Sequence, residues 1–205
     1  MQIQLTNTGK RYNRDWIFRQ CTYTFNAGNS YAIIGPNGSG KSTLLQTIAG
    51  AINPSEGQVN YSVDHRPLTV DVFYKHIALV APYLEVIEEM TATEFLQFHA
   101  AFKPLLPNIT IAEIIAIIGL EKNANKQIRY YSSGMKQRIK LAQAIFADTK
   151  VLLLDEPCTN LDITGYNLYN QLISTYCAHK LIIVSSNDIQ EYGFCRSQIS
   201  IADYK

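Results

Sequence analysis

Apolar and polar residues alternate near the start of the chain and again about fifteen residues later. Ile3 and Leu5 alternate with polar neighbours, and so do Cys21, Tyr23 and Phe25. A period of two residues is typical of strands that bury one face and leave the other in water. We therefore expect the chain to begin with a small lobe of antiparallel strands.

Three short runs are apolar at every position instead of at every second one. They cover residues 31–34, 151–154 and 181–184. Parallel strands have such runs when both faces of their sheet are covered. We predict that the three runs form one central, mainly parallel sheet.

Helical spacing of apolar residues occurs over residues 44–49, and Gly50 is a candidate cap for the C-terminal end of that helix. Apolar residues also recur every three or four positions over 90–102 and 111–120, with prolines between the two segments. These segments predict an inserted helical lobe, at about residues 83–145. The whole chain, residues 1–205, is expected to form a single α/β domain.

Composition excludes several classes of protein. The 18 Lys and Arg nearly balance the 17 Asp and Glu, and a net charge of +1 indicates no broad nucleic-acid-binding face. The four cysteines form no C-x-x-C pair, which argues against a zinc site or a secreted disulfide scaffold. No run reaches the ~20 apolar residues that span a bilayer, and residues 1–10 do not resemble a signal peptide. A cytosolic location is therefore expected.

The segment GPNGSGKST, from Gly35 to Thr43, fits the phosphate-loop pattern G-x-x-x-x-G-K-[ST] between a predicted strand and a predicted helix. Glycines let successive backbone N–H groups point at phosphate oxygens, and the start of the helix adds its positive dipole end. Lys41 is expected to reach the β- and γ-phosphates, and the Ser42 hydroxyl to ligate Mg²⁺. The nucleotide-binding candidates are Asn37, Gly38, Ser39, Gly40, Lys41, Ser42 and Thr43.

Two carboxylates, Asp155 and Glu156, follow the apolar run at 151–154. They would emerge at the carboxyl end of a buried strand, where open α/β sheets bind ligands. Asp155 is expected to hold Mg²⁺ directly or through water, and Glu156 to orient or deprotonate the water that attacks the γ-phosphate. Many strands end in a solvated acid, so it is the phosphate loop that favours the catalytic interpretation.

With these two elements the chain resembles the ATP-binding subunits of ABC transporters over nearly its whole length. The segment YSSGMKQR at 131–138 is similar to the signature segment of that family, usually written LSGGQ. In the family this segment binds the γ-phosphate of ATP held by the other protomer, and Ser132 and Gly134 match the residues that do so. The resemblance implies a head-to-tail dimer around two ATP molecules. In isolation, the segment would also fit an ordinary helix cap.

The segment CTNLD at 158–162 resembles the D-loop of the family, in which Asp162 would contact the dimer seam. Tyr12 stands where the family commonly has an aromatic residue that stacks on adenine, and Trp16 is a second candidate. For either aromatic residue a place in the hydrophobic core is an equal alternative.

Two positions depart from the family pattern. Where the family usually has a glutamine that senses Mg²⁺, this chain has Pro82, which offers no side-chain ligand. The metal would then rely on Ser42, Asp155, phosphate oxygens and water. Where a histidine usually contacts the γ-phosphate, the chain has Asn187, whose amide can donate a hydrogen bond but cannot titrate. Ser186 and Asn187 could instead form a simple turn.

Residues 83–93 are the expected contact with a membrane partner. Val86, Ile87 and Met90 would share one face of a helix, and the other face would carry Glu85, Glu88 and Glu89. In the family this region receives a helix of the membrane subunit. The apolar face could equally pack inside the helical lobe.

The resemblance implies an ATPase that binds ATP and Mg²⁺ and powers a separate transmembrane permease from the cytoplasmic face of the membrane. ABC ATPases of DNA repair have a long coiled-coil insertion, and ribosome-acting members have two cassettes in one chain; neither feature is present. A module that binds ATP but hardly hydrolyses it is suggested by Pro82 and Asn187, whereas Glu156 argues against it. The short chain is similar to small export subunits, including those of haem exporters, but this likeness does not identify a substrate.

Overall fold

The computed structural model describes all residues from 1 to 205. In chain order its strands and helices are β1 (Gln2–Tyr12), β2 (Asp15–Asn26), β3 (Ser30–Ile34), α1 (Lys41–Ile48), β4 (Glu56–Val63), β5 (Arg66–Leu68), α2 (Val70–Phe73), η1 (Tyr74–His76), β6 (Ile77–Val80), α3 (Ala92–Phe102), α4 (Ile111–Ile117), η2 (Glu121–Asn123), η3 (Ile128–Tyr130), α5 (Ser133–Ile145), β7 (Val151–Asp155), α6 (Ile163–Tyr176), β8 (Leu181–Ser185), α7 (Ile189–Tyr192), β9 (Ser197–Ser200) and η4 (Ile201–Tyr204). None of the helices has the length and apolar character that a membrane span requires.

The central sheet has the strand order β6-β7-β8-β3-β9, and every neighbouring pair is parallel. It contains all three apolar runs, which confirms their prediction as one parallel sheet. Successive residues of β7 show why the runs are continuous. Leu152 and Leu154 pack into a cluster of 27 buried residues with the helices on one face, while Val151 and Leu153 pack into a cluster of 19 on the other.

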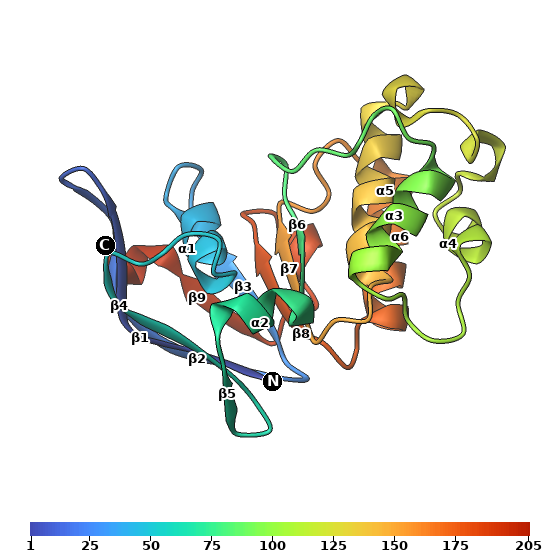
Figure 1. Cartoon of the computed structure of the whole chain (residues 1–205). Coiled ribbons are helices and arrows are strands. Elements are labelled where there is room, and N and C mark those ends of the chain that lie inside the picture. The colour runs from blue at the N-terminus through green and yellow to red at the C-terminus, as the bar shows by residue number, and fades with distance from the viewer.

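An antiparallel sheet of four strands, in the order β2-β1-β4-β5, covers the second face of the parallel sheet together with α1 (Figure 1). Ile3 pairs with Phe25 and Leu5 with Tyr23, in the antiparallel register that the alternating pattern predicts. Ile3, Leu5 and Phe25 are buried because they point toward α1 and the parallel sheet. The prediction of an N-terminal antiparallel lobe is confirmed.

Helix α1 ends where the sequence predicts. Gly50 has the left-handed φ of 72°, which glycine adopts without a steric penalty. Its N–H donates to Thr47 O at 3.1 Å, and the N–H of Ala51 donates to Gln46 O at 3.0 Å. This pair of hydrogen bonds is a Schellman motif, which satisfies the last carbonyl groups of the helix.

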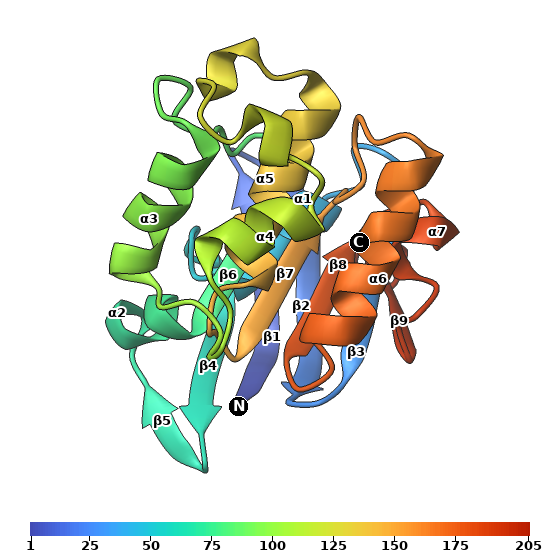
Figure 2. The same ribbon diagram turned by 90° about the vertical axis from the view of Figure 1, so that its right-hand side faces the viewer.

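Helices α3, α4, α5 and α6 lie on the first face of the parallel sheet (Figure 2). Helices α3 and α4 fall inside the two periodic segments and begin with the same capping box. Thr91 pairs with Glu94, and Thr110 pairs with Glu113; each threonine hydroxyl accepts from the backbone N–H of its glutamate. A capping box satisfies two N–H groups that a helix start otherwise leaves unpaired. The local sequence therefore determines where both helices begin.

The helical face predicted over residues 83–93 is wrong up to Met90, because this stretch is irregular backbone. The carbonyls that a helix would use within itself accept from a distant segment instead. Glu88 O accepts from Arg129 N at 3.0 Å, and Met90 O accepts from Ile128 N at 2.8 Å. The side chains of Glu88 and Glu89 pair with Lys136 and Arg129 respectively. Tertiary hydrogen bonds thus replace the helical ones.

Candidate nucleotide-binding site

The phosphate loop joins β3 to α1 at the carboxyl edge of the parallel sheet. Gly40 has a φ of 100°, and a Cβ built on it would come within 2.3 Å of Ile17 Cγ2, so a larger residue does not fit. Among the backbone N–H groups of this loop that have no acceptor within the protein are those of Gly38, Gly40, Lys41, Ser42 and Thr43. Unpaired N–H groups at the start of a helix form an anion site. The loop therefore has the hydrogen-bond donors that a phosphate chain needs.

Lys41 lies inside this loop and is only 4% exposed. Its Nζ donates to Gly35 O at 2.9 Å and to Pro36 O at 3.2 Å. An ammonium group has three donors, so one remains for a phosphate oxygen. The carbonyl groups of Gly35 and Pro36 thus hold the Lys41 ammonium group inside the loop, where it can bind an anion.

Asp155 and Ser42 fit a magnesium ion. Asp155 ends β7, is 2% exposed, and its Oδ1 has no hydrogen-bond partner in the protein. A buried carboxylate oxygen without a partner is costly unless a cation or water satisfies it. Ser42 lines the phosphate-loop cavity, as does Glu156, the residue that follows Asp155. Mg²⁺ takes oxygen ligands and keeps several waters, so these two groups are sufficient protein ligands.

Glu156 shares a cavity of about 240 Å³ with the phosphate-loop residues and Ile17. Its φ of 43° is in the left-handed region, which non-glycine residues rarely adopt and which is common at functional sites. Two hydrogen bonds hold this conformation: Glu156 N donates to Ser185 O at 2.9 Å, and Glu156 O accepts from the Thr159 hydroxyl at 2.8 Å. Glu156 thus lines the same cavity as the residues with unpaired loop amides.

Asn187 lies just beyond β8 and reaches the tip of the phosphate loop. Its Nδ2 donates to Asn37 Oδ1 at 3.0 Å. The turn interpretation also holds, because Ser186 Oγ accepts from Asp188 N at 2.9 Å. The turn therefore places the Asn187 amide against Asn37, which lines the phosphate-loop cavity.

Pro82 is exposed, and its side chain has no group that could bind a metal ion. The next residue, Tyr83, has a polar group that sequence analysis did not consider. Partial burial is the main cause that raises the pKa of its hydroxyl, the nearby amide of Gln46 in α1 lowers this pKa, and the charge of Asp155 raises it. In the sequence, the only indication of this polar group was a tyrosine directly after Pro82.

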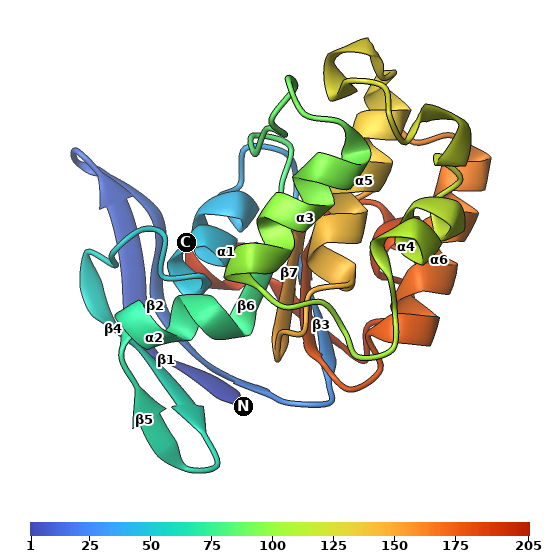
Figure 3. The same cartoon turned by 45° about the vertical axis from the view of Figure 1, so that its right-hand side comes forward.

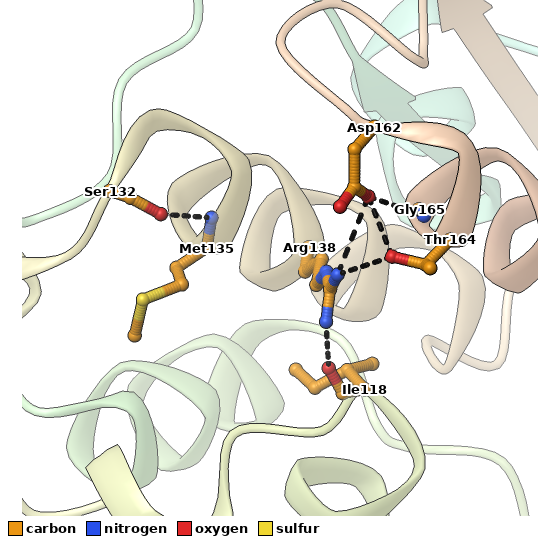
Figure 4. A network of polar contacts seen from close by, with 7 residues as sticks. All are labelled: Ile118, Ser132, Met135, Arg138, Asp162, Thr164 and Gly165. Atoms are coloured by element: carbon orange, nitrogen blue, oxygen red, sulfur yellow. Dashed lines mark hydrogen bonds and ion pairs between the residues drawn. The ribbon is translucent and has the colours of Figure 1, made fainter.

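The signature candidates lie at the start of α5, at a second cavity of about 350 Å³. Ser132 Oγ accepts from Met135 N at 3.3 Å, so Ser132 is the helix cap of the alternative interpretation (Figure 4). The N–H groups of Ser133 and Gly134 have no acceptor in the protein. Because the Ser132 hydroxyl can still donate, these groups form a weak anion site as well.

Asp162 lines the same cavity and caps α6. Its Oδ1 accepts from the Thr164 hydroxyl at 2.7 Å and from Gly165 N at 2.9 Å, and it lies 3.8 Å from Arg138 Nη2 (Figure 4). The hydrogen bond from Thr164 is the largest cause that lowers the Asp162 pKa. Arg138 also donates to Ile118 O at 3.5 Å. This arginine, which sequence analysis did not single out, connects the helical segment to the D-loop.

The two aromatic candidates lie on the β1–β2 hairpin and do not line the phosphate-loop cavity. Tyr12 is 48% exposed, so it is not a core residue. Trp16 is flanked by Arg19 and Arg11, whose guanidinium carbons lie 4.5 and 5.5 Å from its ring centroid. Ile17 is the hairpin residue that reaches the cavity. Adenine stacking by Tyr12 stays a prediction.

The sequence matches one family of proteins and several known relatives. The model of a family described as ABC transporter matches residues 18–159. An uncharacterized ABC transporter ATP-binding protein of Bacillus subtilis, YybJ, is 31% identical over 83% of this chain and 78% of its own length. The cytochrome c biogenesis ATP-binding export protein CcmA of Xylella fastidiosa is 32% identical over 75% and 71%. The Nod factor export ATP-binding protein I of Rhizobium johnstonii is 29% identical over 92% of this chain, which spans 62% of that relative.

Solved structures share the fold. A putative ABC transporter ATP-binding protein from Pyrococcus furiosus superposes with a TM-score of 0.83 at 20% identity, over 100% of both chains. The cassette MJ0796, in a dimeric post-hydrolysis structure bound to ADP and Pi, gives 0.81 at 24% identity over 97% of this chain and 93% of its own. These likenesses confirm the predicted α/β cassette fold. With the family match and the sequence relatives, they show that the chain belongs to the ABC transporter family, as one of its ATP-binding subunits.

Proposed function

We propose that this chain hydrolyses ATP with Mg²⁺ and acts as a head-to-tail dimer that drives a separate transmembrane permease at the cytoplasmic face of a membrane. Residues 1–205 act as one ATPase domain, with a helical lobe over about 83–145. The observation that carries the proposal is one cavity with unpaired loop amides, a buried lysine and Glu156. The direct test is phosphate release from ATP and Mg²⁺ by the purified chain, and no release above buffer would contradict it.

The reaction follows from the placement of these groups. The loop amides and Lys41 bind the phosphates and hold the terminal phosphoryl group in front of Glu156. The Glu156 carboxylate orients a water molecule and accepts its proton as the water attacks. Bound Mg²⁺, held by Asp155 and Ser42, would neutralise negative charge on the phosphate oxygens. When ATP binds, the Asn187 amide releases the Asn37 oxygen and donates its hydrogen bond to the terminal phosphate instead.

Dimerisation is proposed because the signature cavity is incomplete by itself. Its donors include the Ser132 hydroxyl and two amides. The arginine that lines it, Arg138, is engaged with Asp162 and Ile118 O, and the nearby Lys136 is paired with Glu88. Such a site is too weak to hold ATP alone but can bind the phosphate of a nucleotide that a second copy presents. A head-to-tail arrangement brings each signature cavity to the phosphate loop of the partner copy. Solved structures of the cassette MJ0796 are dimeric, which supports a dimer of this chain.

Ser132→Arg is expected to prevent ATP-driven dimerisation while each monomer still binds nucleotide. The arginine side chain fills the signature cavity, and the lost cap costs only about 1 kcal/mol of folding stability. Size-exclusion chromatography with ATP measures the dimer, and a binding assay measures the monomer. Gln97→Arg, at an exposed position of α3, is the matched control and should dimerise normally. An unchanged dimer in Ser132→Arg would show that the signature does not act across the interface.

Asn187→Ala is expected to cost about 1–3 kcal/mol in transition-state stabilisation, because a hydrogen bond to the terminal phosphate is lost. Asn37→Ala is the comparison variant, since it removes the same bond between the two side chains but keeps the Asn187 amide. Asn187→His should retain activity and gain pH dependence near neutrality, because imidazole titrates there. Turnover and ATP affinity that stay at wild-type values in Asn187→Ala would make Asn187 a turn residue only.

The permease contact is proposed at the irregular segment before α3 and at α3 itself. Ile87, Phe98 and Phe102 are exposed apolar side chains there. Relatives named as export proteins support outward transport. Co-purification with a transmembrane chain encoded beside this one tests the contact, and charged substitutions at Phe98 and Phe102 should abolish it without changing ATP binding.

A further inference from the structure

The 3₁₀ turn η4 and Lys205 lie against the phosphate loop. Strand β9 is the parallel neighbour of β3, with Ser200 opposite Ile34. The chain therefore leaves β3 into the phosphate loop and leaves β9 into η4 at the same edge of the sheet. Figures 1 and 3 show the C-terminus beside α1 and the antiparallel sheet.

Packing and capping hold η4 in place. Ile201 is fully buried, and a Cβ built on Gly35 would come within 2.6 Å of its Cγ2. Ser200 Oγ accepts from Ala202 N at 3.3 Å, which fixes the start of the turn. The turn therefore touches the first residue of the phosphate loop directly.

Lys205 connects this turn to two other segments. Its Nζ donates to Ser39 O at 2.7 Å and to Ile17 O at 2.8 Å. Ile17 belongs to β2 and is the residue that packs on Gly40. One ammonium group thus links β2 to the middle of the phosphate loop, and hydrogen bonds from a charged donor are stronger than those from a neutral one.

The hydrogen bond from Lys205 to Ser39 O also determines the orientation of the Gly40 N–H, because both groups belong to one peptide. The chain has no cis peptide bonds, and in a trans peptide the C=O and the N–H point in opposite directions. When Lys205 holds the Ser39 oxygen on one side of the loop, the Gly40 N–H is directed to the other side. Gly40 is one of the residues whose N–H has no acceptor in the protein.

We propose that Lys205 is a positioning residue, which holds the phosphate loop in its anion-binding conformation before the nucleotide arrives. The inference rests on the proposed nucleotide binding by this loop. Lys41 anchors the carbonyls of Gly35 and Pro36 from within the loop, and Lys205 anchors the Ser39 carbonyl from outside it. Preorganised donors bind a ligand more tightly because less conformational freedom is lost on binding.

Lys205→Met keeps the length and apolar stem of the side chain but removes both hydrogen bonds. ATP and ADP affinity should fall about tenfold, the scale of one lost charged hydrogen bond. The kcat at saturating ATP should stay within about twofold, because Lys205 does not touch the reacting atoms. Lys75→Met, at an exposed position of η1, removes the same charge elsewhere and should match the wild type.

Two measurements test the inference: calorimetric affinity for ATP and ADP, and the amide resonance of Gly40 in NMR spectra without nucleotide. The resonance should shift in Lys205→Met, whose Ser39–Gly40 peptide loses its charged donor, and stay unchanged in Lys75→Met. Wild-type affinity in Lys205→Met, or an unmoved Gly40 resonance, would overturn the role of Lys205. Failure of the wild-type chain itself to bind ATP would instead contradict the proposed function.

Discussion

Glu156→Gln is expected to slow ATP hydrolysis by about 10²- to 10⁴-fold while ATP affinity stays nearly intact, because that is the usual contribution of a general base. Glutamine keeps the size of the side chain and most of its hydrogen bonds but loses the negative charge and the basicity. ATP should still close the dimer, so ATP-bound dimers should accumulate. Single-turnover hydrolysis, nucleotide affinity and size-exclusion chromatography measure the three effects.

The matched control is Glu85→Gln, which removes one negative charge outside the phosphate-loop cavity. It should hydrolyse ATP at the wild-type rate. A loss smaller than about threefold in Glu156→Gln is inconsistent with a general base. In that case the chain would be better described as a nucleotide-gated module, the alternative that Pro82 and Asn187 suggest.

Lys41→Ala is expected to weaken ATP binding by about a hundredfold or more and to abolish measurable turnover. The change removes the buried cation that faces the phosphates, and loss of one partner from a buried charge pair costs about 2–5 kcal/mol or more. It also leaves the carbonyls of Gly35 and Pro36 without their donor, so the loop loses preorganisation. Calorimetric affinity for ATP and a phosphate-release assay measure both effects.

Lys122→Ala, at an exposed position of η2, is the control for loss of one positive charge. It should bind and hydrolyse ATP as the wild type does. If Lys41→Ala also kept wild-type affinity and turnover, the phosphate loop would not be the nucleotide site. Thermal unfolding without nucleotide shows whether the variant is folded.

The sequence predicted those structural elements that depend only on residues close to one another in the chain. The continuous apolar runs predicted the parallel strands because both of their faces are buried. Gly50 predicted the end of α1, since glycine adopts the left-handed conformation that a Schellman motif requires. The phosphate loop and the two acids at the end of β7 were predictable for the same reason. Their spacing along the chain sets their geometry at a strand end.

Helical spacing of apolar residues gave a wrong prediction where the backbone forms hydrogen bonds with a segment distant in the sequence. Val86, Ile87 and Met90 have helical spacing, yet the carbonyls of Glu88 and Met90 bond to residues 128 and 129. Helix propensity is weak compared with such tertiary hydrogen bonds. Strand β9 and η4 were not predicted either, because their partners, β3 and the phosphate loop, lie far away in the sequence.

The sequence by itself determined which residues can bind phosphate, hold a metal ion or polarise water, because these are properties of the side chains and of short motifs. Only the tertiary structure decided which of them meet. Asn187 reaches Asn37 across 150 positions, and Lys205 reaches Ser39 across 166. The order of the parallel strands brings these pairs together, since β8 and β9 flank β3 and end at the edge where the phosphate loop begins. Strand order depends on long-range packing, which no local pattern of residues records.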